Sequence, residues 1–445
     1  MIKRSIYSLA IISMLALFGL AQDGNPLGTP NQAAAVTEFD ANGMKVIVKR
    51  RPSATVAVGL FIRGGARNIT DKSAGIETLM LNAATEGSKK YPRQALRREL
   101  ARTGSVITAG ASQDYSAISL ATTRQNFDRL WDVFTDVALN PTFAPEDVER
   151  IKSQLLTGLR ERESDPDNAL DAVVDRSVYA GHPYANEVSG TTSTVSSFTP
   201  ADLRAYHQKV MTASQLLLVV VGDVDSETLR KRVTASFASL PKGNYKEAPF
   251  PALNFSNPTL DVSPRTLQTN YVKGVFPAPT LGTTDFYAMR VATMLLRDRV
   301  FEEVRNARQL SYAPNADMDN YAVNTGNIYV TAVDANQAVR VMLNEIKEMK
   351  TSLISQRQLD AVAGQFLTTY YIGQETNAAQ AGELARYELI GGGWRNAFEF
   401  LNRIRQVTPE QVRDVSNKYM KNIRFAVVGS PSAIDRTVFV EGQTE

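Results

Sequence analysis

The stretch TPADLR at residues 199–204 leads, 23 residues after its threonine, to Gly222 at the end of the run VVV. A second stretch, TPEQVR at residues 408–413, leads after 21 residues to Gly429 at the end of the run VV. Threonine before proline is a frequent helix start, because threonine caps the helix and proline fits its first turn. Each stretch therefore predicts a helix followed by a buried strand, and the two copies indicate a repeat.

A second pair of segments recurs at the same distance. Residues 145–156 and 356–367 are both expected to begin helices. Apolar residues occupy matching places in them: Val148 and Leu359, Leu155 and Phe366, Leu156 and Leu367. The shared offset of about 210 residues indicates an internal duplication. We therefore expect an α+β fold with two homologous domains of the same topology, each a mainly antiparallel sheet covered by helices.

Turn and proline signals divide the chain further. The dipeptide Asn42-Gly43 predicts a tight hairpin turn between two short strands. Five of the 19 prolines fall between Pro241 and Pro264, a density typical of a linker or an extended connection. The predicted organisation is a signal peptide (1–21), a polar leader (22–35), an N-terminal domain (36–240), a proline-rich linker (241–264), a C-terminal domain (265–435) and a tail (436–445).

The first residues predict a secretory signal peptide. Lys3 and Arg4 precede an uncharged apolar run at residues 6–20, and small residues ending at Ala21 provide a cleavage site. The run is shorter than the roughly 20 residues of a membrane-spanning helix, and no cysteine follows it for lipid attachment. Export without disulfides fits the periplasm of a Gram-negative bacterium, where we expect the protein to be soluble or peripherally attached to a membrane.

Two histidines and no cysteine among 445 residues exclude several kinds of chemistry. Without cysteine the chain has no disulfides, thiolate metal sites, iron–sulfur clusters or cysteine nucleophile. His182 and His207 lie 25 residues apart, so no local two-histidine zinc motif exists. The formal net charge of +3 falls to +1 without Lys3 and Arg4, which gives no electrostatic basis for binding nucleic acid.

Short motifs follow one another along nearly the whole mature chain. They are NGMKVIV at 42–48, GGAR at 64–67, GIETLMLN at 75–82, ESDP at 163–166, GHPY at 181–184, VVVGD at 219–223 and VTP at 407–409. In this order and spacing they resemble the pitrilysin-type peptidases, the family of insulysin, the mitochondrial processing peptidase and the core subunits of the bc1 complex. The resemblance implies two homologous domains arranged like a clamshell, and peptides as substrates.

Active members of that family carry H-x-x-E-H on the helix after this glycine. Two imidazoles one turn apart hold zinc, and the glutamate activates the metal-bound water. Aligned on Gly75, the histidine positions fall on Thr78 and Asn82, and the glutamate position falls on Leu81. The third ligand of the family falls near Gly158. None of these residue types holds zinc, so the resemblance implies a member without a metal, whose zinc would come from a partner subunit.

The segment FEEVRNARQLSY at residues 301–312 resembles the part of the second domain in which active members have an arginine and, seven residues later, a tyrosine. In the family a helix ends and a strand begins there. The resemblance implies that Arg305 and Tyr312 donate hydrogen bonds to the substrate carbonyl and to the oxyanion that develops on it. The residues just before, 295–299, lack the glycines that the family often has. Without the resemblance, Arg305 would be a surface ion-pair residue and Tyr312 the first residue of a strand.

The remaining polar candidates have structural interpretations. Glu77 and Glu86 lie nine residues apart and are expected to be solvated on the helix surface. His182, before a proline, is expected to pack or hydrogen-bond, and His207 to occupy a polar helix position. The glycine run at residues 391–393 is expected to end a helix rather than form a mobile substrate loop.

Three hypotheses about function follow. The leading one is a non-catalytic subunit of an exported heterodimeric zinc peptidase, in which Arg305 and Tyr312 complete the active site of a homologous zinc-bearing partner. The second is a structural or peptide-binding scaffold, as a homodimer or in an envelope complex. The third, an autonomous enzyme with a different site, has no supporting Ser/His/Asp set, phosphate-binding loop or dinucleotide motif.

Overall fold

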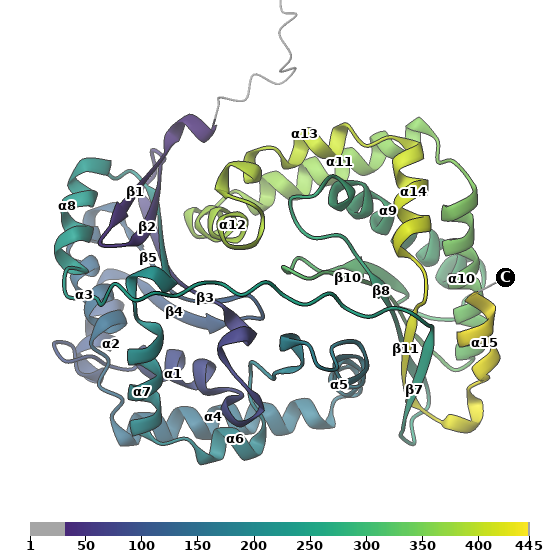
Figure 1. Cartoon of the computed structure of the whole chain (residues 1–445), viewed down its shortest axis with the longest axis horizontal. Coiled ribbons are helices and arrows are strands. Elements are labelled where there is room, and N and C mark those ends of the chain that lie inside the picture. Colours follow the sequence, from purple (N-terminus) through teal and green to yellow (C-terminus); the bar gives the residue numbers. More distant parts are fainter. Residues whose placement is uncertain (1–31, 444–445) are drawn as a thin grey trace, which may run out of the picture.

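A computed structural model describes residues 32–443 of the chain (Figure 1). Within these residues the strands form two sheets, one in each half of the sequence. The expected α+β class and the duplicated topology are confirmed. The predicted signal peptide, residues 1–21, lies outside the described residues. In the described part, no helix has the length and apolar character needed to cross a membrane.

The first sheet has the strand order β1-β2-β6-β3-β5-β4 within the described residues, with β2 parallel to β6 and the other neighbours antiparallel. Its central strand β6 is buried along its whole length, as expected for a run that is apolar on both faces. Asn42 and Gly43, with φ of 56° and 94°, close the predicted hairpin. The strands are β1 (Val36–Ala41), β2 (Met44–Arg50), β3 (Thr55–Arg63), β4 (Val106–Ala111), β5 (Tyr115–Thr123) and β6 (Leu216–Gly222).

The second sheet repeats this arrangement. In the described residues its order is β7-β11-β8-β10-β9, with β7 parallel to β11 and the other neighbours antiparallel. These strands correspond in order to β2, β6, β3, β5 and β4, so β1 has no counterpart. The strands are β7 (Thr259–Pro264), β8 (Asn270–Pro277), β9 (Asn315–Met318), β10 (Thr325–Ala332) and β11 (Arg424–Gly429).

The two TP stretches begin corresponding helices, as predicted. Thr199 caps α7 by accepting a hydrogen bond from the Asp202 amide, and Thr408 caps α14 by accepting one from the Gln411 amide, both at 3.3 Å. The helices of the first half are α1 (Ile76–Ala84), α2 (Arg93–Thr103), α3 (Phe127–Leu139), α4 (Pro145–Ser164), α5 (Pro166–Val178), α6 (Thr192–Ser197), α7 (Pro200–Val210) and α8 (Ser226–Ser236).

The helices of the second half follow the same plan, with one irregularity. The first of them, α9, continues into a π-helical turn, η7 (Phe301–Ala307). The α-helices are α9 (Thr284–Val300), α10 (Ala335–Thr351), α11 (Gln356–Gly373), α12 (Asn377–Ile390), α13 (Phe400–Arg405), α14 (Pro409–Tyr419) and α15 (Arg436–Val440). The predicted helix end at residues 391–393 is present, since Gly391 caps α12.

Each half contributes one helix to the other half. Helix α12, from the second half of the sequence, packs on the first sheet through Leu384 and Ala385 (Figure 1). Helix α5, from the first half, packs on the second sheet through Val173 and Val174. The two helices begin about 210 residues apart, at equivalent places in the repeat. The halves are therefore joined by a reciprocal exchange of helices.

Two predicted boundaries are corrected. The predicted linker, residues 241–264, ends earlier, because Thr259–Pro264 form β7 beside β11. Residues 241–258 form no helix or strand and cross from the first half to the second (Figure 1). The predicted tail, residues 436–445, contains α15, whose fully buried Phe439 ring contacts the Phe425 ring edge-on at 5.1 Å. An apolar side chain on a short terminal helix thus closes the second core.

Candidate functional site

Helix α1 carries three of the positions that the resemblance links to zinc. Gly75, with φ of 84°, precedes the helix, and Leu81 is fully buried in the first core. The Thr78 hydroxyl donates a hydrogen bond to the Val188 carbonyl at 2.6 Å. The Asn82 side-chain amide donates one to the Thr78 carbonyl at 2.8 Å. Both polar side chains are thus engaged with the backbone and do not form a ligand set.

The fourth position, Gly158, lies on α4, which packs against α1. A Cβ atom built on Gly158 would meet no atom within 4 Å, so the fold leaves room there for a side chain. Within residues 32–443, no group of three or more His, Cys, Asp or Glu side chains is placed to hold a metal ion. A hydroxyl, an amide, a leucine and a glycine do not fit zinc, which prefers imidazole, thiolate and carboxylate ligands.

Glu77, expected on the helix surface, is instead buried with 2% of its surface exposed. Its carboxylate accepts hydrogen bonds from the hydroxyls of Ser116 on β5 and Tyr206 on α7. Burial raises the pKa of Glu77, and these hydrogen bonds oppose the rise. The expectation was wrong because α1 lies between the first sheet and α7, so that it has no solvated face at Glu77.

Glu86 is also more enclosed than expected. It is half-buried just after α1 and forms ion pairs with Arg93 at 3.1 Å, Arg97 at 3.5 Å and Arg150 at 2.5 Å. These arginines lie on α2 and α4, so the carboxylate fastens the end of α1 to its two neighbours. Glu86 therefore has a structural role, and it is not free to join Glu77 in binding a cation.

Neither histidine forms part of a polar site. The Nδ1 atom of His182 accepts a hydrogen bond from the Tyr184 amide at 3.1 Å, and its ring stacks on Phe250 at 5.4 Å, which confirms its expected packing role. His207, expected at a polar position, is buried, with Nε2 2.9 Å from the Ala138 carbonyl. Burial lowers the pKa of both imidazoles.

Arg305 and Tyr312 lie together at the end of η7. The Arg305 Nη1 group donates a hydrogen bond to the Tyr312 carbonyl at 2.8 Å. The guanidinium carbon lies 4.0 Å from the centre of the Tyr312 ring and 5.0 Å from that of the Phe301 ring, so the cation is held between two aromatic faces. The Tyr312 side chain points into solvent, with 79% of the residue exposed.

The turn between these two residues is fixed by local contacts. The Leu310 amide donates a hydrogen bond to the Val304 carbonyl at 2.9 Å, and Arg308 forms an ion pair with Glu303. Gln309 has a positive φ of 54°, which costs a residue with a side chain some strain. Tyr312 does not begin a strand as expected, because β9 starts three residues later. The pair is presented by a rigid turn.

The two sets of candidate residues remain separate. Within the described residues, no hydrogen bond or ion pair connects Thr78, Asn82 or Gly158 with Arg305 or Tyr312. The structure therefore places the zinc-motif positions on two adjoining helices and Arg305 beside Tyr312, but no direct polar contact links the two groups. A half-buried arginine beside an exposed tyrosine is suited to donate hydrogen bonds to a molecule supplied from outside the chain.

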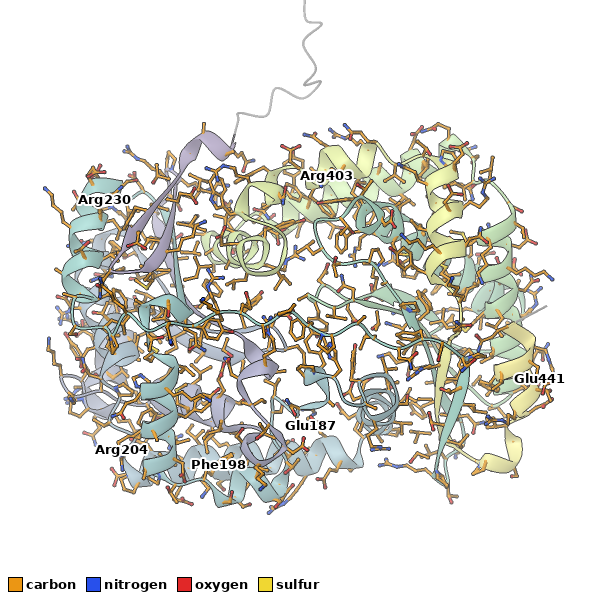
Figure 2. All side chains as sticks on the ribbon, in the orientation of Figure 1. Glu187, Phe198, Arg204, Arg230, Arg403 and Glu441 are labelled. Atoms are coloured by element: carbon orange, nitrogen blue, oxygen red, sulfur yellow. The ribbon has the colours of Figure 1, made fainter. Side chains whose placement is uncertain are left out.

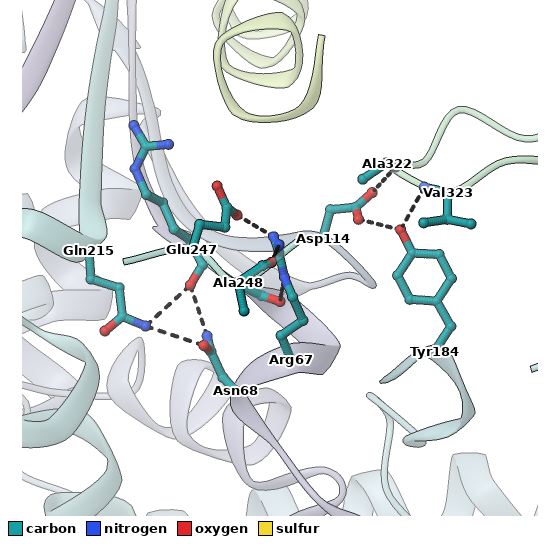
Figure 3. Close-up of polar contacts among 11 residues, drawn as sticks. Arg67, Asn68, Asp114, Tyr184, Gln215, Glu247, Ala248, Ala322 and Val323 are labelled. Carbon is teal, nitrogen blue, oxygen red and sulfur yellow. Dashed lines mark hydrogen bonds and ion pairs between the residues drawn. The ribbon is translucent and has the colours of Figure 1, made fainter. Parts of the chain in front are cut away.

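A polar network that the sequence did not reveal joins the two halves near Asp114 (Figure 3). The Asp114 carboxylate accepts hydrogen bonds from the Tyr184 hydroxyl and from the Ala322 amide, the latter at 3.0 Å. The Tyr184 oxygen accepts one from the Val323 amide at 3.3 Å. Burial raises the pKa of Asp114. Tyr184 belongs to the GHPY motif. Its hydrogen-bond partners Asp114 and Val323 lie 70 and 139 residues away in the sequence, so no local sequence pattern links them to it.

Arg67, from the GGAR motif, holds the connecting segment in place (Figure 3). Its guanidinium forms an ion pair with Glu247 and donates a hydrogen bond to the Ala248 carbonyl at 2.6 Å. It also lies over the Phe250 ring, 4.0 Å from the ring centre. The residues of this motif therefore stabilise the path of the chain between the halves.

Two family models match this architecture in sequence. The insulinase model of peptidase family M16 matches residues 45–192, and the model of the peptidase M16 inactive domain matches residues 197–366. The chain belongs to peptidase family M16. An uncharacterized zinc protease from Mycobacterium leprae is 23% identical over 408 residues, which cover 89% of this chain and 92% of that protein. At the positions of the zinc motif, this M16 member departs from the active pattern.

Two further comparisons concern the fold and a respiratory protein. A crystal structure of a peptidase M16 inactive domain from Pseudomonas fluorescens has a TM-score of 0.82 at 19% identity and covers 89% of this chain and 98% of its own. Cytochrome b-c1 complex subunit 1 from Mus musculus is 23% identical over 251 residues, 56% of this chain and 52% of that protein. In sequence, the chain is thus similar both to a protein described as a zinc protease and to one described as a respiratory subunit.

Proposed function

We propose that this M16 member is a non-catalytic subunit of a heterodimeric zinc peptidase. A homologous partner would hold the zinc, and this chain would shape the peptide chamber and supply Arg305 and Tyr312 to the partner's active site. The guanidinium and the phenol would donate hydrogen bonds to the oxyanion that forms when water attacks the peptide carbonyl. The chain alone would not hydrolyse peptides.

One observation supports this proposal above the others. The positions for zinc ligands and base are Thr78, Leu81, Asn82 and Gly158, whereas the arginine–tyrosine pair is present and positioned. Within the described residues no hydrogen bond engages the Tyr312 hydroxyl, and that residue is 79% exposed. In the part of the chain that the structure describes, the Arg305 side chain makes one hydrogen bond, to the Tyr312 carbonyl. Donors therefore remain available for a substrate.

We further propose that the protein is exported to the periplasm of a Gram-negative bacterium. The support is the basic and apolar pattern of residues 1–21 together with the absence of cysteine. Mass spectrometry of the mature protein would test it, since cleavage after Ala21 leaves a chain that begins at Gln22. A mature protein that begins at Met1 would contradict it.

A second candidate function is a structural or peptide-binding scaffold in an envelope complex. It is favoured by the similarity to subunit 1 of the cytochrome b-c1 complex. In that case Arg305 and Tyr312 would be inherited and idle. The two candidates differ in one measurable respect, which is the effect of the pair on hydrolysis.

The test uses the mature chain mixed with a zinc-bearing M16 homologue encoded by the same organism. We expect a complex on size exclusion, zinc in that complex, and peptide hydrolysis that neither chain shows alone. The double variant Arg305→Ala/Tyr312→Phe should lower kcat/KM by about 100-fold or more, because loss of one oxyanion donor costs about 10² to 10³. Zinc content and complex formation should not change.

The matched control is Arg297→Ala/Tyr371→Phe. Among residues 32–443, Arg297 forms an ion pair only with its neighbour Asp298, at 3.6 Å, and its side chain is 43% exposed. Tyr371 is 41% exposed. This variant should retain kcat/KM within about twofold. If the complex is active and the Arg305→Ala/Tyr312→Phe variant has the same kcat/KM as the wild type, the pair does not take part in hydrolysis. That result would favour the scaffold function. Failure of every homologue to bind would contradict the subunit proposal itself.

A further inference from the structure

A cleft opens at the edge of the second half, and none of the candidate site residues lines it. It has a volume of about 770 Å³ and lies between α10, the end of α14 and the C-terminal residues after α15. Glu441, labelled in Figure 2, marks its position at the edge of the molecule. The floor is apolar and the rim is basic. The floor comprises Leu343, Ile346, Met420, Ile423 and Val438, and the rim Arg340, Lys347, Lys350 and Lys421.

The basic rim is not neutralised by the described residues. Lys347, Lys350 and Lys421 form no ion pair there, and Arg340 lies 3.6 Å from Asp435. Glu441 is the single carboxylate among the described residues that line the cleft. The nearby Lys418 on α14 differs from them, because it pairs with Asp285 at 2.6 Å. The described residues that line the cleft therefore carry an excess of positive charge.

This excess costs the protein free energy when the cleft is empty. Lys350 is half-buried, and both its burial and the charge of Lys421 lower the pKa of its ammonium group. Two like charges beside an apolar floor repel each other more strongly than they would in open water. The same low-dielectric walls concentrate the field and attract anions from solution. A bound anion would offset the repulsion.

We propose that this cleft binds a phosphate-bearing ligand whose phosphate contacts Lys347, Lys350 and Lys421 and whose apolar part lies on the floor of the cleft. Three ammonium groups are compact point charges that suit the several oxygens of a phosphate, whereas a single carboxylate is matched better by an arginine fork. The phosphate belongs to a free phosphate ester or to the headgroup of an anionic phospholipid. The chemistry of recognition is the same for both.

The test uses the full-length mature chain and two probes. Calorimetric titration with inorganic pyrophosphate represents the free ligand. Co-sedimentation with phosphatidylglycerol vesicles, compared with phosphatidylcholine vesicles, represents the lipid. We expect saturable binding of at least one probe, weakened by salt because the contacts are ionic. Pyrophosphate alone indicates a free ester, and a preference for phosphatidylglycerol alone indicates a headgroup.

The variant Lys350→Met/Lys421→Met should weaken that binding at least tenfold, because it removes two charges while keeping the apolar stems. The control Lys89→Met/Lys90→Met removes two exposed lysines outside the cleft and should leave the affinity within twofold. If the first variant is poorly folded, Lys347→Ala/Lys421→Ala changes only exposed side chains and should also weaken binding. Absence of binding by both probes, or equal losses in variant and control, would overturn the proposal.

Discussion

Several carboxylates between the two halves are held where ionisation is unfavourable. Asp175 on α5 is the clearest case. Burial, together with the charges of Glu187 and Asp171, raises its pKa from 3.8 to about 7. Asp171, on the same helix, pairs with Lys273 at 2.9 Å.

The raised pKa makes stability depend on pH. The folded protein binds a proton at Asp175 more tightly than the unfolded chain does, so this contribution is complete below about pH 4 and is lost as the pH rises through 7. Asp175→Asn should therefore raise the free energy of unfolding at pH 8 by about 2 kcal/mol, since partial contact with water reduces the full effect of the shift. Urea unfolding at pH 4, 6 and 8 measures it.

The control for this experiment is Asp128→Asn, which removes an exposed ion pair with Arg232, does not involve the surroundings of Asp175, and should lower stability by less than about 1 kcal/mol. If Asp175→Asn left the pH dependence between pH 4 and 8 unchanged, the carboxyl would not be protonated in the fold.

At the residue scale, the sequence allowed the positions of the zinc motif to be assigned through the resemblance. It did not reveal the buried polar groups. Thr78, Leu81 and Asn82 could be found because the motif is local and its spacing follows one helix turn. The position of Glu77 depends on Ser116 and Tyr206, which are 39 and 129 residues away. Local patterns carry no information on such partners.

The exchanged helices α5 and α12 stabilise the fold across the boundary between the halves. Leu384 and Ala385 of α12 belong to the same apolar cluster as Phe61, Leu217 and Val219 of the first sheet. At the start of α12, the Asn377 side-chain amide donates a hydrogen bond to the Thr55 carbonyl at 2.7 Å. A helix of one half thus completes the core of the other.

Truncating one of these contacts should affect both halves. Leu384→Ala should lower the free energy of unfolding by about 2–4 kcal/mol, as expected for a buried leucine. Amide hydrogen exchange should speed up in β3 and β6 of the first half as well as in α12. Leu353→Ala, at a residue that is 52% exposed, serves as the control and should change stability by less than about 0.5 kcal/mol. Faster amide exchange in α12 alone would contradict the role of α12 in completing the core of the first half.

At the element scale, the repeat predicted the starts of α4, α7, α11 and α14 and the strands β6 and β11, but not this exchange. The capping threonines and the apolar run of β6 were strong local signals. An apolar stripe on α12 shows that one face is buried, but it does not identify the sheet that buries it. The predicted linker includes β7 because Pro258 precedes this short edge strand and Pro264 ends it, so the segment resembles an extended connection.

The whole molecule is best described as two copies of one topology locked together. Besides α5 and α12, the contacts of Asp114 with Ala322 and of Arg67 with Glu247 connect segments far apart in sequence. Chains of this length often unfold in separate steps, one for each domain. Here neither half retains a complete core once the other has opened, because each loses a helix.

We therefore expect one calorimetric transition, with calorimetric and van't Hoff enthalpies in agreement. A protease site inserted between Ser256 and Asn257, which are exposed and hydrogen-bond only locally, provides a second test. After cleavage the two fragments should remain associated on size exclusion. Two resolved transitions, or separation of the fragments, would show that the exchanged helices α5 and α12 contribute little to the stability of the contact between the halves.

The helix exchange also has a consequence for the order of events during synthesis. Helix α12 begins about 150 residues after β6 ends, so the first sheet is complete long before its cover exists. At about 5–20 residues per second, this interval lasts roughly 10–30 s. Throughout it, Ile47, Phe61 and Leu217 present a bare apolar surface. We therefore expect the nascent first half to be prone to aggregation until the ribosome has delivered α12.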